Sequence, residues 1–189
     1  MSGDNPVQSQ SVQLVRMTIG DVAEVMELEK LCFPKDSWTE EDYIKNLSGQ
    51  DNYYWKVRPT NSNQRPGIPP ILASGGYHLE ETNTHITTLA THPNWRRRKI
   101  GEWFLLNMLM ISRYAGAKLA YLEVREDNMV AIRMYLKFGF LLVNQLEHFY
   151  CSDSVSANLL VLYSLDRVNV WQPLQKTLDS IVIDLSYNG

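Results

Sequence analysis

The hydrophobic residues of this chain recur with two periods, and the changes of period divide it into strands and helices. Residues 12–16 alternate apolar and polar side chains, which predicts a first strand, and residues 52–57 are also strand-like. Residues 71–79 and 84–91 predict two antiparallel strands that turn at residues 80–83. Because Thr and Ile favour a pleated surface, we expect these two strands at the centre of the sheet.

Helical spacing predicts helices between and after these strands. One follows Asp21, which is expected to cap it, and a second follows Thr39, an N-cap with Asp42 as its capping-box partner. Residues 101–114 are apolar almost all round, which predicts a helix buried against a sheet. A further helix is predicted over about residues 128–138, and each of the last two is ended by a glycine.

The remaining pattern completes an α+β fold. Further strands are predicted over residues 119–124, 140–143 and 158–165. A strand, helix, strand succession across residues 84–124 requires a parallel step in an otherwise mostly antiparallel sheet. We therefore expect a mixed central sheet flanked by about four helices.

Length and composition predict one main domain with two short appendages. The chain has 189 residues, of which 44% are hydrophobic and 21% are charged, as in ordinary globular domains. Residues 1–11 are rich in Ser, Gln and Asn, which predicts a flexible tail before a domain over residues 12–166. Residues 167–189 predict a helix and a short strand that pack on the domain or on a partner subunit, so the chain is a monomer or a homodimer.

Charge and hydropathy exclude several classes of partner. The net charge of −3 is the opposite of what a nucleic-acid-coating protein needs. No apolar run reaches the roughly 18 residues that span a bilayer, and the N-terminus is polar instead of resembling a signal peptide. We therefore expect a cytoplasmic protein that binds neither nucleic acid nor membrane.

The two cysteines predict neither a disulfide nor a metal site. Cys32 and Cys151 are far apart and have no Cys or His at metal-ligand spacing. An acyl-carrying role for Cys151 needs a nearby base, for which His148 is the local candidate. We favour the other interpretation, two reduced and inert thiols, and expect no metal.

A basic turn between the strand at 84–91 and the buried helix suits phosphate binding. It consists of Arg96, Arg97, Arg98, Lys99, Ile100 and Gly101. A helix start offers free N–H groups and the positive end of the helix dipole, and both attract phosphate. The alternatives are a solvated basic run or a nuclear-import tag. The position at a strand-to-helix switch point favours the phosphate interpretation.

Three polar residues further along are candidates for a functional site, and two of them suit acid–base chemistry. Glu123 interrupts an apolar strand, so its burial is costly unless it is used or paired, and a structural salt bridge is the alternative. Asn128 and Tyr135 share a helix face about 10 Å apart. Tyr135 carries a phenol that can donate a proton, although a core aromatic is the usual role at such spacing.

These residues resemble the signatures of the GNAT acetyltransferases. The turn is similar to the pattern [Gln/Arg]-x-x-Gly-x-[Gly/Ala], with Lys99 in place of the middle glycine. If that position needs a positive φ, Lys99 is held there at a cost of about 1 kcal/mol. The second signature, an Asn before a helix that bears a Tyr and ends in Gly-Phe, is matched closely by Asn128, Ala131, Tyr135, Gly139 and Phe140.

Within this superfamily the span 12–165 is similar to the RimI-type and N-terminal peptide acetyltransferases. Four stretches carry the resemblance: Cys32-Phe33-Pro34 with Trp38 and Tyr43, residues 88–93, Leu122-Glu123-Val124-Arg125 with Asn128, and His148-Phe149-Tyr150. The last stretch is usually Asn-Tyr-Tyr, so here an imidazole replaces an amide and one phenol is lost.

The resemblance implies roles for these residues. Acetyl-CoA is the implied co-substrate, with the backbone of Leu89, Ala90 and Thr91 holding its acetyl-pantetheine arm, Asn128 and Tyr135 contacting the cofactor, and residues 96–101 binding its phosphates. Glu123 is the implied proton acceptor and Tyr135 the donor. Phe33, Pro34, Phe149 and Tyr150 are implied to bind the peptide, and His85 stands where related enzymes can place a base, although a structural strand histidine is the alternative.

The resulting hypothesis is direct acetyl transfer to a protein N-terminus such as that of a ribosomal protein. Acetylation of lysine side chains, polyamines or another small amine remains an alternative within the same chemistry. A CoA-binding module without catalysis is the alternative outside it.

Overall fold

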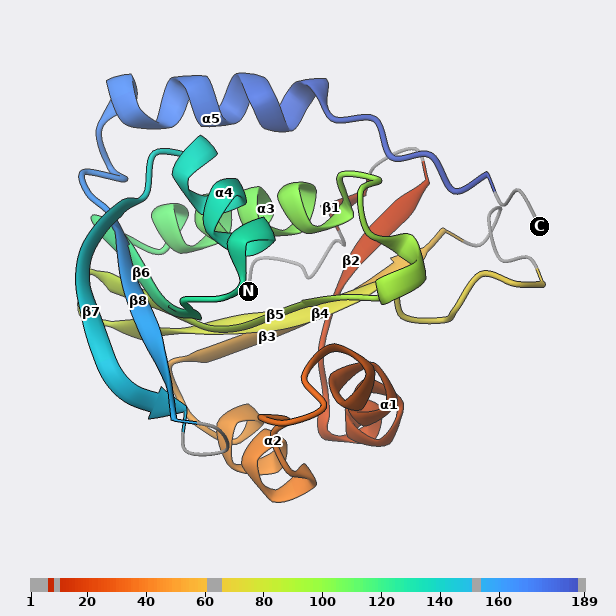
Figure 1. Cartoon of the computed structure of the whole chain (residues 1–189). Helices are drawn as coiled ribbons and strands as arrows, with labels where there is room; N and C mark the ends of the chain where they lie inside the picture. Colours follow the sequence, from red (N-terminus) through yellow and green to blue (C-terminus); the bar gives the residue numbers. More distant parts are fainter. Residues whose placement is uncertain (1–6, 9–10, 61–65, 151–153, 187–189) are drawn as a thin grey trace. The chain divides into compact units, whose positions relative to one another are not determined.

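The computed structural model describes residues 7–8, 11–60, 66–150 and 154–186 (Figure 1). Its elements are β1 (Val7–Gln8), β2 (Val12–Arg16), α1 (Val22–Cys32), α2 (Glu40–Leu47), β3 (Asn52–Pro59), β4 (Ala73–Glu80), β5 (Asn83–Thr91), α3 (Ile100–Tyr114), β6 (Leu119–Arg125), α4 (Met129–Lys137), β7 (Leu141–Tyr150), β8 (Val155–Leu162) and α5 (Val168–Ser180). Two short 3-10 turns, η1 (Ile19–Asp21) and η3 (Pro93–Trp95), precede α1 and α3.

The strand order is β1-β2-β3-β4-β5-β6-β8-β7. β5 and β6 pair in parallel, whereas β1 with β2, β2 with β3, β6 with β8 and β7 with β8 are antiparallel. This confirms the predicted α+β fold with one parallel step, and β4 and β5 occupy the central positions. The described residues contain five α-helices: four in the domain, as expected, and α5 in the C-terminal extension, where a helix was also predicted.

The chain divides into two compact units. The first comprises Met1–Gly76, Thr88–Leu105 and Ser180–Gly189, and the second Tyr77–Thr87 and Leu106–Asp179. β4, β5 and α3 each contribute residues to both units. None of the described helices is long and apolar enough to cross a membrane.

The first unit is built around an aromatic and aliphatic cluster between α1, α2 and β3. Buried side chains of the cluster are Met17, Val22, Val25, Met26, Leu28, Tyr43, Tyr54, Ile71 and Ala90. The rings of Trp38, Tyr43 and Tyr54 pack at tilted angles with centroids 5.2–6.4 Å apart. Such pairs add to the free energy of burial because ring edges meet ring faces.

The two predicted helix caps of this unit have different outcomes. At α2 the prediction is confirmed, because Thr39 Oγ1 accepts from the Asp42 N–H at 3.1 Å and the Asp42 carboxylate accepts from the Thr39 N–H at 2.9 Å. At α1 Asp21 is the N-cap residue, as predicted, but its side chain makes no hydrogen bond to the helix. Its carboxylate accepts from the Thr18 N–H and pairs with Lys56, whose buried ammonium group requires a counter-charge.

The second unit places β6 between β5 and β8. Asn83–His85 lie opposite Leu119–Tyr121 in parallel register, and Glu123 lies opposite Leu159 on β8. Side chains of β6 alternate in burial, with Ala120, Leu122 and Val124 buried and the residues between them half-buried. The polar residues of this strand therefore share one face of the sheet.

Glycines end the two helices that follow β5 and β6, as predicted. Gly116 has φ of 101° after α3, and Gly139 has φ of 86° after α4. These are left-handed conformations that other residues adopt only at a cost.

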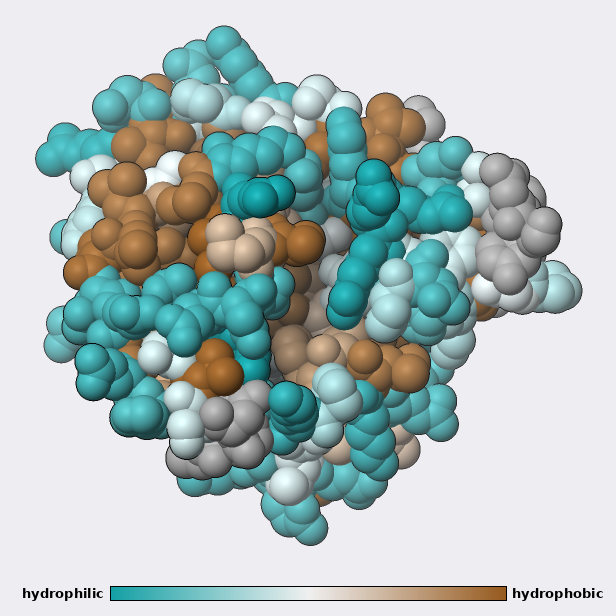
Figure 2. Space-filling model, in the orientation of Figure 1, coloured by the Kyte–Doolittle hydropathy of each residue, from teal (hydrophilic) through white to brown (hydrophobic). Residues whose placement is uncertain are grey.

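β7 departs most from its predicted length. The strand continues to Tyr150 instead of ending near residue 143, with register shifts between Leu142 and Asn144 and between Leu146 and Tyr150. The predicted strand ended too early because the second half of β7 is mostly polar and shows no alternation of apolar and polar residues. Exposed apolar side chains lie on its first three residues and on α4, and Figure 2 shows hydrophobic residues gathered over this region.

Parts of the predicted appendages are described. Val7 and Gln8, within the expected N-terminal tail, pair with β2. After α5 the chain is extended over residues 181–186, where Ile181, Ile183 and Leu185 are buried and the residues between them are exposed. No strand is assigned to this segment, although its burial alternates as in a strand.

A close backbone approach in β4 yields a stability prediction. A Cβ at Gly76 would lie 2.4 Å from Tyr54 Cδ1 and 2.5 Å from the Tyr53 carbonyl oxygen. We expect Gly76→Ala to lower the free energy of unfolding by about 1–3 kcal/mol through overpacking, measured by urea denaturation. Gly20→Ala, whose Cβ would meet its nearest neighbour at 3.7 Å, should stay within about 0.5 kcal/mol of the parent. Equal stability of both variants would contradict the prediction.

Candidate functional site

The turn between β5 and α3 holds two residues other than glycine in the left-handed region. Lys99 has φ of 63°, which confirms the conformation expected at the position where a glycine is usual. Arg97 has φ of 62° and is a second such residue, which the sequence did not indicate. Because each costs about 1–2 kcal/mol, surrounding contacts must hold the turn in place.

The helix that follows begins at the end of this turn. The Trp103 N–H donates to the Lys99 carbonyl at 2.9 Å, which opens the hydrogen-bond ladder of α3. The N–H groups of Ile100 and Gly101 precede that ladder and lack acceptors within the helix. This arrangement, with the positive end of the helix dipole, can bind a phosphate group.

The four cations of the turn are used differently. Arg96 Nε donates to the Thr91 carbonyl at 3.2 Å. The Arg98 guanidinium lies 4.7 Å from the centre of the Trp95 ring and donates to two carbonyls of the C-terminal segment. Arg97 and Lys99 are exposed. Protein contacts thus hold two of the four cations predicted to meet a pyrophosphate.

The end of β5 is joined to α1 through one carbonyl. Cys32 Sγ donates to the Thr91 oxygen at 3.3 Å, beside the bond from Arg96. Burial raises the pKa of the Cys32 thiol above its usual value, against the lowering effect of Arg96. A protonated, half-buried thiol is a poor nucleophile, in keeping with the expected inert cysteine. Cys151 lies outside the described residues.

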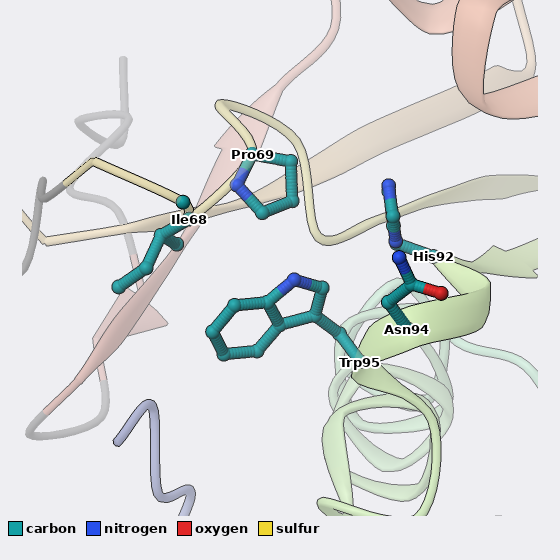
Figure 3. A pocket seen from close by; sticks show the side chains of 6 residues that line it. Ile68, Pro69, His92, Asn94 and Trp95 are labelled. Atoms are coloured by element: carbon teal, nitrogen blue, oxygen red, sulfur yellow. The ribbon is translucent and has the colours of Figure 1, made fainter. Parts of the chain in front are cut away.

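A pocket of about 370 Å³ lies beside this turn in the first unit. Figure 3 shows Ile68 and Pro69 on one side of it and His92, Asn94 and Trp95 on the other. His92 Nδ1 is buried without a hydrogen-bond partner among the described residues. Burial, and then the nearby Arg96 charge, lowers the pKa of His92. The pocket could not be predicted from the sequence, because the pattern of residues in the loop before β4 does not show which part of the chain the loop contacts.

A buried carboxylate holds the segment that contains the predicted peptide-binding residues Phe33 and Pro34. Glu29 is 1% exposed; it accepts from the Trp38 N–H at 3.1 Å and from the Tyr43 hydroxyl at 2.8 Å. The bond to Trp38 ties the end of α1 to the residues before α2. Glu29 was not singled out from the sequence, since it occurs within an ordinary amphipathic helix pattern.

In the second unit the two candidate bases form one pair. His85 Nε2 lies 2.7 Å from Glu123 Oε2, and the His85 ring stacks on Tyr121 at 4.5 Å with an interplanar angle of 6°. The parallel register sets His85 opposite Tyr121, and Glu123 follows two residues later on the same face. The sequence predicted both residues separately, and Glu123 is paired, as its structural alternative expected, through a contact with His85 that is a salt bridge only when the imidazole is protonated.

Tyr135 and Asn128 occupy opposite ends of α4. Tyr135 is 6% exposed and packs against Phe140 at 5.6 Å. Burial, and then the nearby Tyr150, raises the pKa of Tyr135, so its hydroxyl keeps its proton at neutral pH. Asn128 Oδ1 accepts from the Ala131 N–H at 3.2 Å as the helix cap, which leaves its amide NH₂ for a ligand.

The late aromatic stretch ends β7. Phe149 is exposed and meets Tyr150 edge to face at 5.2 Å, while the Arg125 guanidinium lies 5.0 Å from the centre of the Tyr150 ring. His148 has φ of 51° within the irregular end of the strand. Across the described ranges there is no group of three or more His, Cys, Asp or Glu residues arranged to hold a metal ion.

Comparison with known proteins identifies a family. Residues 22–140 match the Acetyltransferase (GNAT) family. The matched range contains the turn after β5, the His85–Glu123 pair, Asn128 and Tyr135, and it ends before Phe149.

Individual relatives are distant. An uncharacterized protein of Mycobacterium leprae is 28% identical over 145 residues, which are 76% of this chain but only 38% of that protein. An N-alpha-acetyltransferase of Sulfurisphaera tokodaii is 27% identical over 146 residues, covering 74% of this chain and 86% of the relative. The crystal structure of the ribosomal-protein-S18-alanine N-acetyltransferase from Escherichia coli has a TM-score of 0.69 at 17% identity, over 81% of this chain and 94% of that one, which shows a shared fold.

The Glu29 contacts predict a pH dependence of stability. Burial raises the pKa of this carboxyl above its ordinary value of 4.5, although the bonds from Trp38 and Tyr43 lower it in part. The folded chain therefore binds this proton more tightly than the unfolded chain. Its contribution to stability is fully present below about pH 4.5 and is lost as the pH rises through the raised pKa.

Glu29→Gln removes this titration and keeps groups that can bond to Trp38 and Tyr43. We expect the free energy of unfolding of the parent to fall relative to that of Glu29→Gln as the pH rises from about 4.5 to 7. Urea denaturation across this range measures the difference. Glu27→Gln, at an exposed position of α1, is the matched control, and the same pH dependence in both variants would contradict the role of burial.

Proposed function

The chain belongs to the acetyltransferase (GNAT) family and is an acetyl-CoA-dependent N-acetyltransferase, and we propose that it acetylates the α-amino group of a protein or peptide N-terminus. The His85–Glu123 pair, 2.7 Å apart on the polar face of β5 and β6, is the observation that carries the proposed chemistry. A distant relative from Sulfurisphaera tokodaii bears the name N-alpha-acetyltransferase, which supports the proposed acceptor.

Acetyl-CoA binding is proposed to use the turn after β5 and the start of α4. The free amides of Ile100 and Gly101 and the exposed cations Arg97 and Lys99 suit the pyrophosphate. The backbone of Leu89, Ala90 and Thr91 is proposed to hold the acetyl-pantetheine arm, and Asn128 to contact it through its amide NH₂. Acetyl-CoA is the only co-substrate in this proposal, and no metal is needed.

Glu123 is the proposed proton acceptor. The amine must be neutral to attack the thioester carbonyl, because only then does its nitrogen carry a free electron pair. The Glu123 side chain is 19% exposed, so a water molecule can bridge its carboxylate to the incoming ammonium group. His85, bonded to the same carboxylate, orients it and can take up the proton in turn.

Tyr135 is the proposed proton donor. As the new C–N bond forms, the C–S bond breaks and its electron pair goes to the sulfur of CoA. The raised pKa keeps Tyr135 protonated, so its hydroxyl can give a proton to that sulfur. The surplus proton of the attached nitrogen returns through water to the Tyr135 phenolate, and Glu123 releases to solvent the proton that it took from the ammonium group, which balances the reaction.

Aromatic side chains support a peptide acceptor. Phe33 and Pro34 lie in the segment held by Glu29, and Phe149 and Tyr150 end β7. Ring faces and edges suit the apolar and amide surfaces of a peptide. A polyamine would instead be bound by clustered carboxylates, whereas the Arg125 guanidinium places a positive charge 5.0 Å from the centre of the Tyr150 ring.

The proposed acid–base roles predict defects in turnover. Glu123→Gln and Tyr135→Phe should each lower kcat by about a hundredfold because each removes one proton-transfer group. The KM for acetyl-CoA should change by less than about twofold, since neither change alters the phosphate turn. His85→Gln should lower kcat less than Glu123→Gln, because it removes only the orienting partner.

Steady-state kinetics with a peptide acceptor measures these effects. Tyr163→Phe, which removes a phenol from an exposed position of the second unit, is the control for Tyr135→Phe. Parent-like kcat in both Glu123→Gln and Tyr135→Phe would refute the role assignment.

The proposed acceptor is tested separately. An α-amine has a pKa of about 8 and a lysine side chain about 10.4, so near neutral pH far more of the α-amine is unprotonated. We expect kcat/KM for peptides with free N-termini to exceed that for N-terminally blocked lysine peptides and for spermidine by about tenfold or more. A higher kcat/KM for spermidine or for blocked lysine peptides would show that this amine, and not a peptide N-terminus, is the preferred acceptor.

A further inference from the structure

The C-terminal segment contacts the phosphate turn through one side chain. Arg98 Nη1 donates to the Asp184 carbonyl at 3.1 Å and to the Ser186 carbonyl at 2.7 Å. The same guanidinium lies 4.7 Å from the centre of the Trp95 ring. All of these residues belong to the first unit, and Trp95 is itself 2% exposed. Arg98 is therefore held between a fixed ring and two backbone acceptors.

The acceptors are themselves held in place. Ile181, Ile183 and Leu185 bury their side chains at alternate positions, which fixes the segment as an extended strip. The Asp184 carboxylate accepts from the Ser186 N–H and hydroxyl, each at 2.7 Å. These local bonds set the direction of the backbone that presents both carbonyls to Arg98.

Arg98 stands between the two left-handed residues of the turn. Arg97 precedes it with φ of 62° and Lys99 follows it with φ of 63°. A glycine at either position would relax this conformation, but neither residue is a glycine. Contacts from outside the turn to Arg98, the residue between them, can instead hold the turn in this conformation.

We propose that residues 181–186 act as a positioning segment for acetyl-CoA, and that they hold the phosphate turn, whose two left-handed positions lack glycine, through Arg98. The inference rests on the proposed role of this turn in binding the cofactor. Arg98 is then a positioning residue, and the phosphates are met by the amides of α3 and by Arg97 and Lys99. The rival assignment is direct contact of Arg98 with a phosphate.

A double-mutant cycle separates these two assignments. The variants are a chain that ends at Ile183, which lacks both acceptor carbonyls, the full-length Arg98→Ala, and their combination. Each single change should weaken acetyl-CoA binding by about tenfold, as expected for the loss of charge-assisted hydrogen bonds. If Arg98 acts through the segment, the combination loses no more than either change alone. Calorimetry gives the dissociation constants.

A glycine substitution tests the link to backbone strain. Lys99→Gly removes a cation in either background, so it should lower acetyl-CoA affinity in the full-length chain but much less, or not at all, in the chain that ends at Ile183, where glycine also adopts the left-handed conformation without external support. Steady-state kinetics should show the same pattern in the KM for acetyl-CoA, with the KM for the peptide unchanged. Loss of folding alone would alter both constants and would not depend on the residue at this position.

Trypsin provides a readout that does not depend on the cofactor, since the turn contains four cleavage sites. Residues 96–99 should be cut faster in the chain that ends at Ile183 than in the parent. Asp184→Ala, in the full-length chain, should give an intermediate rate because it removes both bonds to Ser186. Val182→Ala, at an exposed position of the same segment, is the matched control and should match the parent in both assays.

The outcomes distinguish the inference from the function on which it rests. Unchanged trypsin protection after truncation overturns the inference, as do additive losses of affinity in the cycle, which would assign Arg98 to direct phosphate contact. If truncation speeds cleavage but neither the parent nor the truncated chain binds acetyl-CoA, the contact between Arg98 and the segment is supported and the role of the turn in binding the cofactor is overturned.

Discussion

The first unit depends on a backbone turn that two residues hold in the left-handed region. β5 must stop at Thr91 and α3 must start at Ile100 for free helix amides to be presented after a strand. Arg97 and Lys99 supply the change of direction at a conformational cost that glycine would avoid. Arg98 stacks on Trp95 and donates to the carbonyls of Asp184 and Ser186. These contacts can offset the cost, and they link the turn to the C-terminal extension through one side chain.

Features determined by neighbouring residues could be predicted from the sequence. The capping box of Thr39 and Asp42 spans three residues, and the glycines after α3 and α4 lie within a few residues of the helix ends. The order of elements and the parallel step followed from the same local patterns. The conformation expected of Lys99 also followed, because the replaced glycine pointed to a positive φ.

Contacts between distant residues could not be predicted in this way. Arg98 bonds to carbonyls 86 and 88 residues later, and backbone acceptors leave no trace in the residue pattern. His85 and Glu123 were each identified by type, but their pairing depends on the register of β5 against β6. A shift of one residue would turn Glu123 to the apolar face, so the pair is a property of the sheet and not of either strand.

Two carboxylates in this chain differ in their surroundings, which suit one to a structural role and the other to proton transfer. Glu29 is 1% exposed, and a backbone amide and a phenol each donate to one of its oxygens. Its proton exchange is therefore coupled to the stability of the first unit. The Glu123 side chain is 19% exposed and bonds to an imidazole, a group that can itself carry a proton. In the sequence Glu123 interrupts an apolar strand, whereas Glu29 lies in an ordinary amphipathic helix pattern, so only the structure shows that Glu29 is the more deeply buried of the two.

The environment of Tyr135 makes its proposed role consistent with its raised pKa. In water a phenol has a pKa of about 10 and a thiol about 8.5, so the transfer is uphill by about 1.5 units. Burial raises the pKa of Tyr135 further, but a thiolate leaving into the same apolar surroundings loses its hydration as well. Because both anions are destabilised together, the difference between them does not grow with burial. A buried phenol can therefore protonate the departing sulfur while remaining neutral between turnovers.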